Sequence, residues 1–293
     1  MHALPTLVAL AAALLLTPPI LRHLQAEGFT RENWRGVRLP FPGGIAIVAA
    51  GVLAVGACAA VTAIARVELF GVGAPIDLTY PLGVALLGLI DDLVSGPPAR
   101  SRGWRGHGRA VMRGEFSTGA LKAVGSLALA LYALQGTAWG EGVGEYLLAV
   151  ALLVLTTNLF NLLDLRPGRA AKAFLLLGVL LSAVAWHGRL GDLGDLGDFV
   201  PLWAVGPLAA PILVVGFFDL RERTMLGDTG ANVIGAVAGL WLIYAFDTTG
   251  QAIALAIVLA LTVYGEFRSL NTLIERTPLL REIDSIGRND AHA

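Results

Sequence analysis

Acidic and amide side chains mark the ends of three apolar runs in this sequence, and oxygen-bearing side chains of this kind suit a particular chemistry. Mg²⁺ prefers oxygen ligands and typically takes one or two carboxylates together with phosphate oxygens and waters. The residues in this pattern are Asp91 and Asp92 in GLIDDL, Asn161 and Asp164 in NLFNLLDL, and Asp219 and Asp228 in FFDLRERTMLGDTG. The pattern predicts a magnesium site that also holds a phosphorylated ligand.

Cations follow the second of these runs. Arg166, Arg169 and Lys172 come soon after Asp164, with Pro167 between the two arginines. A guanidinium offers a planar fork of donors that matches phosphate or carboxylate, and such cations stabilise the charge of a transferring phosphoryl group. The alternative is ordinary anchoring of a helix end at the inner leaflet. Acids and cations together favour phosphoryl transfer, in which positioning and electrostatics do most of the work.

The composition indicates a membrane protein. Of 293 residues, 56% are hydrophobic and only 15% are charged, which is too few charges to cover the surface of a soluble domain of this size. The net charge of −1 gives no support to nucleic-acid binding. The single cysteine, Cys58, lies in an apolar run, which excludes an internal disulfide framework and a thiolate metal cluster.

The apolar runs are long enough to cross a hydrocarbon core of about 30 Å, which takes roughly 17–25 residues. We expect one all-α membrane domain, residues 1–293, a polytopic bundle of about nine transmembrane helices. The predicted spans are about 3–21, 43–65, 75–90, 118–136, 145–162, 171–187, 200–217, 230–246 and 251–265.

The distribution of cations predicts how the bundle is oriented. With the N-terminus outside, the cytoplasmic segments would be about 22–42, 91–117, 163–170 and 218–229, with a cytoplasmic tail at 266–293. These segments and the adjoining helix ends hold all but two, Arg66 and Arg189, of the 21 Lys and Arg residues. Because cytoplasmic loops retain cations, we expect the N-terminus outside and the C-terminus in the cytoplasm.

The acidic clusters then all lie at the cytoplasmic ends of spans. A single such cluster is usually a helix end emerging into water, but acids at the edge of a span are costly and tend to be functional. An ion-coupled transporter is a weaker interpretation, because transporters place their sites near the midplane of the bilayer.

The ordered motifs resemble those of the polyprenyl-phosphate N-acetylhexosamine-1-phosphate transferase superfamily, the group of MraY-like and WecA-like enzymes. That superfamily has a Pro/Gly-Gly turn before its second span, an Asp-Asp pair after the third and a Lys in the fourth. Asn-x-x-Asp follows its fifth span, and Gly-Asp-x-Gly precedes the eighth. The corresponding residues here are Pro40, Pro42, Gly43 and Gly44, then Asp91 and Asp92, Lys122, Asn161 and Asp164, and Gly227, Asp228 and Gly230. Each motif is weak alone, but the ordered set is fairly specific.

The resemblance implies a reaction at the cytoplasmic face of the cell membrane, as in the synthesis of lipid intermediates for cell-wall or surface glycans. A polyprenyl phosphate, such as undecaprenyl phosphate, would attack the β-phosphate of a nucleotide-diphosphate sugar and release a nucleoside monophosphate. Mg²⁺, with Mn²⁺ as a substitute, would bridge the diphosphate on Asp228, Asp91 and Asp164. Asp91 or Asp92 would serve as base or position the lipid phosphate, and Lys122 would pair with phosphate. The expected substrate contacts are Asn161, Asp164, Arg166, Arg169, Lys172, Asp219, Gly43 and Gly44.

The sequence also departs from the superfamily. There Asn-x-x-Asp continues as Gly-x-Asp-Gly, whose second Asp helps to read the nucleotide base, whereas here Pro167 stands in that place. The His-rich loop near the C-terminus is missing, since no His lies between His187 and His292. Both departures affect donor recognition more than metal chemistry. They leave open a non-catalytic relative that binds polyprenyl phosphate or nucleotide as a carrier, sensor or partner subunit.

The tail predicts a helix lying on the inner membrane face. Leu270, Leu273, Ile274 and Leu280 recur near helical spacing with charges between them, and Pro278 interrupts the pattern. The glycine-rich helices of this class also make a homodimer a reasonable expectation.

Overall fold

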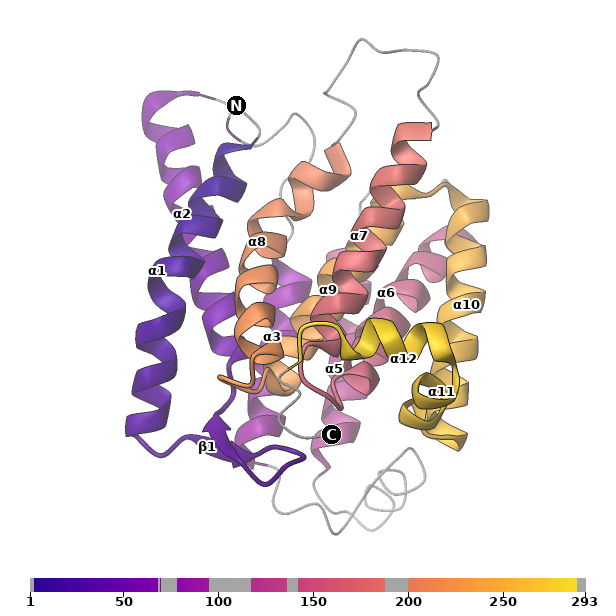
Figure 1. Cartoon of the computed structure of the whole chain (residues 1–293). Helices are drawn as coiled ribbons and strands as arrows, with labels where there is room; N and C mark the ends of the chain where they lie inside the picture. The colour runs from indigo at the N-terminus through magenta and orange to yellow at the C-terminus, as the bar shows by residue number, and fades with distance from the viewer. Residues whose placement is uncertain are drawn as a thin grey trace.

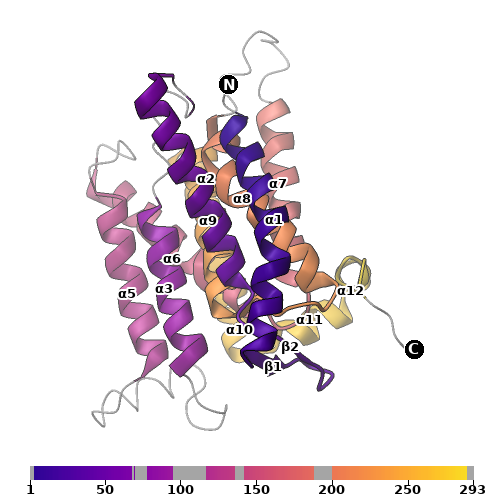
Figure 2. The same ribbon diagram turned by 90° about the vertical axis from the view of Figure 1, so that its left-hand side faces the viewer.

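The computed structural model describes residues 3–67, 69, 78–94, 117–135, 142–187 and 200–288. Within this part of the chain, nine helices of 16 residues or more run alongside one another (Figures 1 and 2). They are α1 (Leu4–Ala26), α2 (Gly44–Ala65), α3 (Thr79–Val94), α5 (Thr118–Ala133), α6 (Val143–Leu163), α7 (Arg169–His187), α8 (Val200–Leu220), α9 (Gly227–Ala245) and α10 (Thr248–Phe267).

Each of the nine predicted apolar runs coincides with one of these helices, and the ends differ by at most five residues. Among the residues that the structure describes, four helical segments are long and apolar enough to cross a membrane: Leu4–Ala26, Gly44–Ala65, Val143–Leu163 and Thr248–Gly265. The prediction of a helical, multi-pass membrane protein is therefore confirmed. The count of nine spans, the orientation and the single-domain boundary stay predictions.

Helix α9 forms the centre of the bundle. Every residue from Thr229 to Ile243 is buried, so this helix has no face turned to lipid or water. Helices α3 and α6 pack along it, and α2, α7 and α8 also touch it. A helix that is apolar all round and enclosed in this way is typical of the middle of a bundle, and its N-terminus is consequently fixed by several neighbours at once.

A short antiparallel hairpin follows α1, an element that the sequence pattern did not predict. Strand β1 (Thr30–Glu32) pairs with β2 (Arg38–Pro40), with Arg31 opposite Leu39. The hairpin lies at the lower end of the bundle in both views (Figures 1 and 2).

The tail folds into two short helices, α11 (Leu270–Arg276) and α12 (Pro278–Ser285), separated by Thr277. Pro278 begins α12, where its missing N–H is tolerated, so the predicted interruption falls between two helices. Both run across the lower end of the bundle (Figure 1). The predicted membrane-surface helix thus exists as a helical pair, while its contact with lipid stays a prediction.

Two expectations lie outside the described residues. The acidic stretch GDLGDLGD, 191–198, which we expect to be a solvated turn, is one of them. The other is the loop with His107 in RGHGR, the histidine that we expect to have a function there.

Candidate active site

A lysine and two carboxylates meet at the lower end of the bundle, where α3 and α6 end and α5 and α9 begin. Lys122, in the second turn of α5, forms an ion pair with Asp228 in the first turn of α9. Its Nζ also lies 3.5 Å from Oδ2 of Asp91, in the last turn of α3. The predicted catalytic residues Asp91, Lys122 and Asp228 are therefore brought together from three helices.

Asn161, in the last turn of α6, joins this cluster. In the amide orientation that satisfies both neighbours, its nitrogen donates to Oδ1 of Asp228 at 3.1 Å and its oxygen accepts from Nζ of Lys122 at 3.2 Å. The amide thus bridges the cation and the carboxylate that the lysine already pairs with. We name Asp91, Lys122, Asn161 and Asp228 the lysine cluster.

Asp92, next to Asp91 in the chain, has a different task. Its carboxylate accepts the backbone N–H groups of Asp228 at 3.0 Å and Thr229 at 2.9 Å, and the Thr229 hydroxyl at 2.7 Å. It therefore caps the N-terminus of α9 from another helix, where the free N–H groups and the helix dipole favour an anion. Asp92 is buried, and Arg31 donates to its backbone carbonyl at 3.0 Å.

The surroundings of Asp228 bring the pKa of its carboxyl group close to neutral pH. It lies just before the predicted eighth span, and burial raises its pKa to about 7, with the charge of Lys122 opposing the rise and Asp91 adding to it. A group with such a pKa changes its charge near neutral pH, which is typical of functional sites.

Asp164 lies near the lysine cluster without joining it. It is the residue that ends α6. Burial raises its pKa well above the usual value, and the charges of Asp219 and Asp228 raise it further, whereas Arg169 lowers it. These effects show that Asp164 shares an electrostatic environment with the cluster.

The donor set fits a magnesium ion only in part. Among the described residues, no three His, Cys, Asp or Glu side chains gather closely enough to hold a metal ion by themselves. The predicted set of Asp91, Asp164 and Asp228 is thus not assembled, because Asp164 stands apart. Asp91 and Asp228 remain, and two carboxylates completed by substrate phosphates and waters are a usual magnesium site.

Asp219 supports the turn between α6 and α7. The carboxylate is buried at the end of α8 and accepts the N–H of Gly168 at 2.6 Å. Gly168 has φ of +71°, and an added Cβ would lie 2.5 Å from a Leu220 methyl carbon. The turn at Pro167 and Gly168 therefore requires this glycine, and Asp219 is occupied with backbone rather than presented to a ligand.

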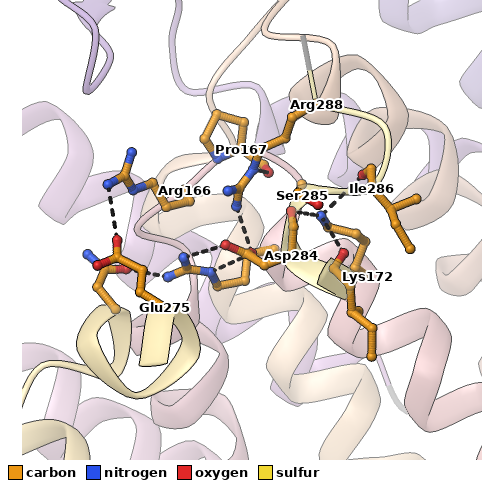
Figure 3. A network of polar contacts seen from close by, with 12 residues as sticks. Arg166, Pro167, Lys172, Glu275, Asp284, Ser285, Ile286 and Arg288 are labelled. Carbon is orange, nitrogen blue, oxygen red and sulfur yellow. Dashed lines mark hydrogen bonds and ion pairs between the residues drawn. The ribbon is translucent and has the colours of Figure 1, made fainter. Parts of the chain in front are cut away.

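Arg169 and Lys172 point toward the tail. Arg169 donates from Nε and one terminal nitrogen to the two oxygens of Asp284, both at 2.9 Å, and from the other nitrogen to Asn271. Lys172 donates to backbone carbonyls at the end of α12, among them that of Ile283 at 3.1 Å (Figure 3). The structure gives these two predicted substrate ligands partners within the protein.

Arg166 differs from Arg169 because it is partly exposed. Its guanidinium lies 4.1 Å from the ring centre of Trp34, on the hairpin, and 3.6 Å from Oε1 of Glu275 on α11. Trp34 is half-exposed, a position that the sequence did not single out.

Gly43 and Gly44 serve close packing at the start of α2. An added Cβ on Gly44 would lie 2.1 Å from the backbone nitrogen of Gly230, so α2 and α9 approach each other backbone to backbone. The N–H groups of Gly43 and Gly44 donate to the carbonyls of Met225 at 2.7 Å and Leu226 at 3.0 Å. The glycine pair, predicted as a substrate contact, therefore holds the loop that leads into α9 and Asp228.

The hairpin clamps the same loop. Glu222 accepts from Asn33 at 3.0 Å and pairs with Arg35, and Met225 donates to the carbonyl of Pro40 at 3.1 Å. Sequence reasoning missed this clamp, because its members are separated by more than 180 residues in the chain.

Comparison with known proteins agrees with part of this description. The chain is 27% identical over 263 residues to the phospho-N-acetylmuramoyl-pentapeptide-transferase of Heliobacterium modesticaldum (strain ATCC 51547 / Ice1). The alignment covers 81% of this chain and 73% of that protein. No protein-family model matches the chain.

Proposed function

We propose that this protein transfers a sugar-1-phosphate from a nucleotide-diphosphate sugar to a polyprenyl phosphate at the cytoplasmic face of the cell membrane, with Mg²⁺ or Mn²⁺. The observation that carries the proposal is the lysine cluster, in which four helices present a lysine, an amide and two carboxylates at one end of the bundle. The similarity to a bacterial phosphotransferase supports the same class of reaction.

Asp91 and Asp228 would hold the metal ion, with Asn161 as a neighbouring oxygen donor. When bound, Mg²⁺ neutralises the diphosphate and supplies charge stabilisation during transfer. Lys122 already balances both carboxylates, and a lysine on a flexible stem can exchange part of that pairing for phosphate oxygens. It would thereby orient the phosphates beside the two acids.

The bond changes follow from the substrates. An oxygen of the lipid phosphate forms a bond to the β-phosphorus, and the bond from that phosphorus to the bridging oxygen breaks. The nucleoside monophosphate leaves with the bridging oxygen, so no net hydrolysis occurs. Positioning of the two phosphates in line supplies much of the rate enhancement for such a reaction.

Asp91 is the better candidate for positioning the lipid phosphate. The carboxylate oxygens of Asp92 already accept two N–H groups and a hydroxyl at the start of α9. Removing it would disturb the helix that carries Asp228, so its contribution would be indirect. We therefore propose different roles for these two adjacent acids, which the sequence leaves equivalent.

The donor would lie toward the turn after α6. Asp164 ends that helix, and the partly exposed Arg166 follows it. We propose Asp164 and Arg166 as contacts of the nucleotide or sugar, with Arg169, Lys172 and Asp219 supporting the turn from behind.

A screen of nucleotide-sugars with purified protein, a short polyprenyl phosphate and Mg²⁺ tests the proposal, with released nucleoside monophosphate as the readout. We expect release from at least one donor, loss of release on chelation of the metal, and none above background with Asp228→Asn. If the wild type releases no nucleotide from any donor while it binds the lipid phosphate regardless of Mg²⁺, the protein is a non-catalytic carrier or sensor and the proposal is wrong.

A further inference from the structure

Asp284, near the end of the tail, is the centre of a buried ionic network. Its side chain is only 10% exposed, and Arg169, itself 5% exposed, donates to its two oxygens from Nε and one terminal nitrogen of the guanidinium. Arg288 donates to the same carboxylate at 2.7 Å (Figure 3). A bidentate arginine–carboxylate pair fixes orientation as well as distance, so α12 is held in one position against the start of α7.

The tail also holds the turn between α6 and α7 at other points. Arg288 donates from Nε to the carbonyl of Pro167 at 3.3 Å, and Lys172 donates to carbonyls at the end of α12. On the other side, Glu275 of α11 pairs with Arg166 at 3.6 Å. Within residues 166–172, the tail therefore binds Arg166, Pro167, Arg169 and Lys172.

This turn directly follows Asp164, which makes its position important to the site. Pro167 has no N–H to donate, and Gly168 gives its N–H to Asp219, while the N–H of Arg169 closes the turn on the carbonyl of Arg166 at 3.2 Å. Beyond this backbone bond, Asp219 of α8 and the tail supply polar partners of the turn. Arg169 follows Asp164 closely in the chain, directly after the turn, so the network adjoins the segment that we propose for the donor.

A buried ion pair by itself adds little to the free energy of unfolding. Desolvating two charges costs several kcal/mol per ion as a general estimate, and apolar replacements are often neutral or stabilising. A buried pair does fix a particular arrangement, and removal of one partner leaves an uncompensated charge. The network is thus better explained by the need to hold the turn in one place than by anchoring of the tail.

We propose that the C-terminal tail helps to form the donor site. Asp284 is a positioning residue that holds Arg169 and, through it, the turn that carries Asp164 and Arg166. This inference rests on the proposed function for the identity of the donor. The tail would thereby supply the support for a turn in which Pro167 replaces the acid expected from the superfamily motif.

The test compares Asp284→Asn with Glu282→Gln, an exposed neutralisation on the same short helix. We expect Asp284→Asn to raise the KM for the nucleotide-sugar about tenfold, while kcat changes less than about threefold and the KM for the lipid phosphate stays constant. Asp284→Glu should restore most of the loss, and Glu282→Gln should behave as wild type. Arg169→Lys, which keeps the charge but loses the fork, should give the same split if Asp284→Asn fails to fold.

Hydrogen exchange measured by mass spectrometry on the detergent-solubilised full chain provides a readout independent of activity. We expect peptides covering residues 164–172 to exchange at least about tenfold faster in Asp284→Asn than in Glu282→Gln. An active wild type with an unchanged donor KM in Asp284→Asn and Arg169→Lys overturns the inference and leaves the proposed function intact. A wild type without transferase activity overturns the proposed function, and exchange at 164–172 then decides the positioning role, an unchanged rate being the outcome against it.

Discussion

Two polar clusters of similar composition lie at the same end of the molecule, and they differ in what they offer a ligand. The lysine cluster keeps part of its charged surface accessible, since the side chains of Lys122, Asp91 and Asp228 are 17%, 21% and 29% exposed. In the network around Asp284, by contrast, Arg169 is 5% exposed and its donors are taken by side chains of the tail. Both combine cations with carboxylates, but the carboxylates of the first are more exposed, at 21% and 29% against 10% for Asp284.

The difference shows that residue types alone do not identify a ligand site. A cationic side chain that is fully paired inside the protein stabilises the structure. A partly exposed one at the edge of the bundle can exchange its protein partner for a ligand. The same contrast separates Arg166, partly exposed beside Trp34, from Arg169 on the next turn. Substitutions matched between the two clusters therefore test the assignment.

The largest expected difference is between Lys122 of the lysine cluster and Lys172, which binds backbone carbonyls beside the Asp284 network. Lys122→Met should lower kcat about 10²–10³-fold, as loss of one electrostatic stabiliser does in other enzymes, because it leaves two carboxylates without their balancing charge. Lys172→Met loses only donors to backbone carbonyls at the end of α12, worth about 0.3–1 kcal/mol at a helix C-terminus, so kcat should change less than about threefold.

Nucleotide release at saturating substrate measures both variants, and size-exclusion behaviour confirms that each remains folded. Equal losses of kcat in the two variants would contradict the distinction between the clusters.

The adjacent acids of α3 provide the second comparison. Asp92→Ala removes the cap of α9 and should lower the free energy of unfolding by about 1–3 kcal/mol, the usual range for a lost cap or unsatisfied buried donors. Asp91→Ala should leave stability nearly unchanged but abolish most of the activity, because this carboxylate faces Lys122. Thermal unfolding in detergent, measured beside turnover, checks both expectations.

The outcome against this assignment is a reversed pattern, in which Asp91→Ala unfolds the protein and Asp92→Ala only slows it. Matching melting temperatures for the two variants would also remove the reason to call Asp92 a cap.

Much of the fold could be predicted from the sequence, because an apolar run of sufficient length has to form a helix in a bilayer. The motif order also predicted that Asp91, Lys122, Asn161 and Asp228 converge, together with Asp164, which does not join them. Asp91 and Asp92 could not be told apart, since successive residues of a helix point in directions about 100° apart and only the neighbours decide which meets α9. The pairing of Arg169 with Asp284 was equally hidden, because it joins residues 115 positions apart.

Backbone packing beside the lysine cluster gives the third comparison. Gly44→Ala places a Cβ 2.1 Å from the nitrogen of Gly230 and should destabilise the protein by about 1–3 kcal/mol, as overpacking does. Gly56→Ala, in the same helix with nothing within 4 Å of the added carbon, should be neutral or stabilise by up to about 1 kcal/mol.

The melting temperatures of both variants, measured in the same detergent, test whether only Gly44→Ala destabilises the protein. Equal melting temperatures would mean that α2 and α9 do not approach as closely as described.

The smallest expected effect is a pH-dependent loosening of the tail, because it arises only in acid. Burial by itself would raise the pKa of Asp284, but hydrogen bonds and charge from Arg169, joined by Arg288, outweigh it and lower the pKa below the usual value. A carboxylate with a lowered pKa in the folded state stabilises that state above its unfolded pKa of about 3.9, and the contribution is lost as the pH falls through the folded value. An environment-sensitive dye on Ser285→Cys should therefore report a tail that stays docked at neutral pH and detaches only below about pH 4, while Asp284→Asn with the same dye should show no such transition. Detachment at neutral pH, or the same acid transition in the Asn variant, would show that the carboxylate of Asp284 does not hold the tail.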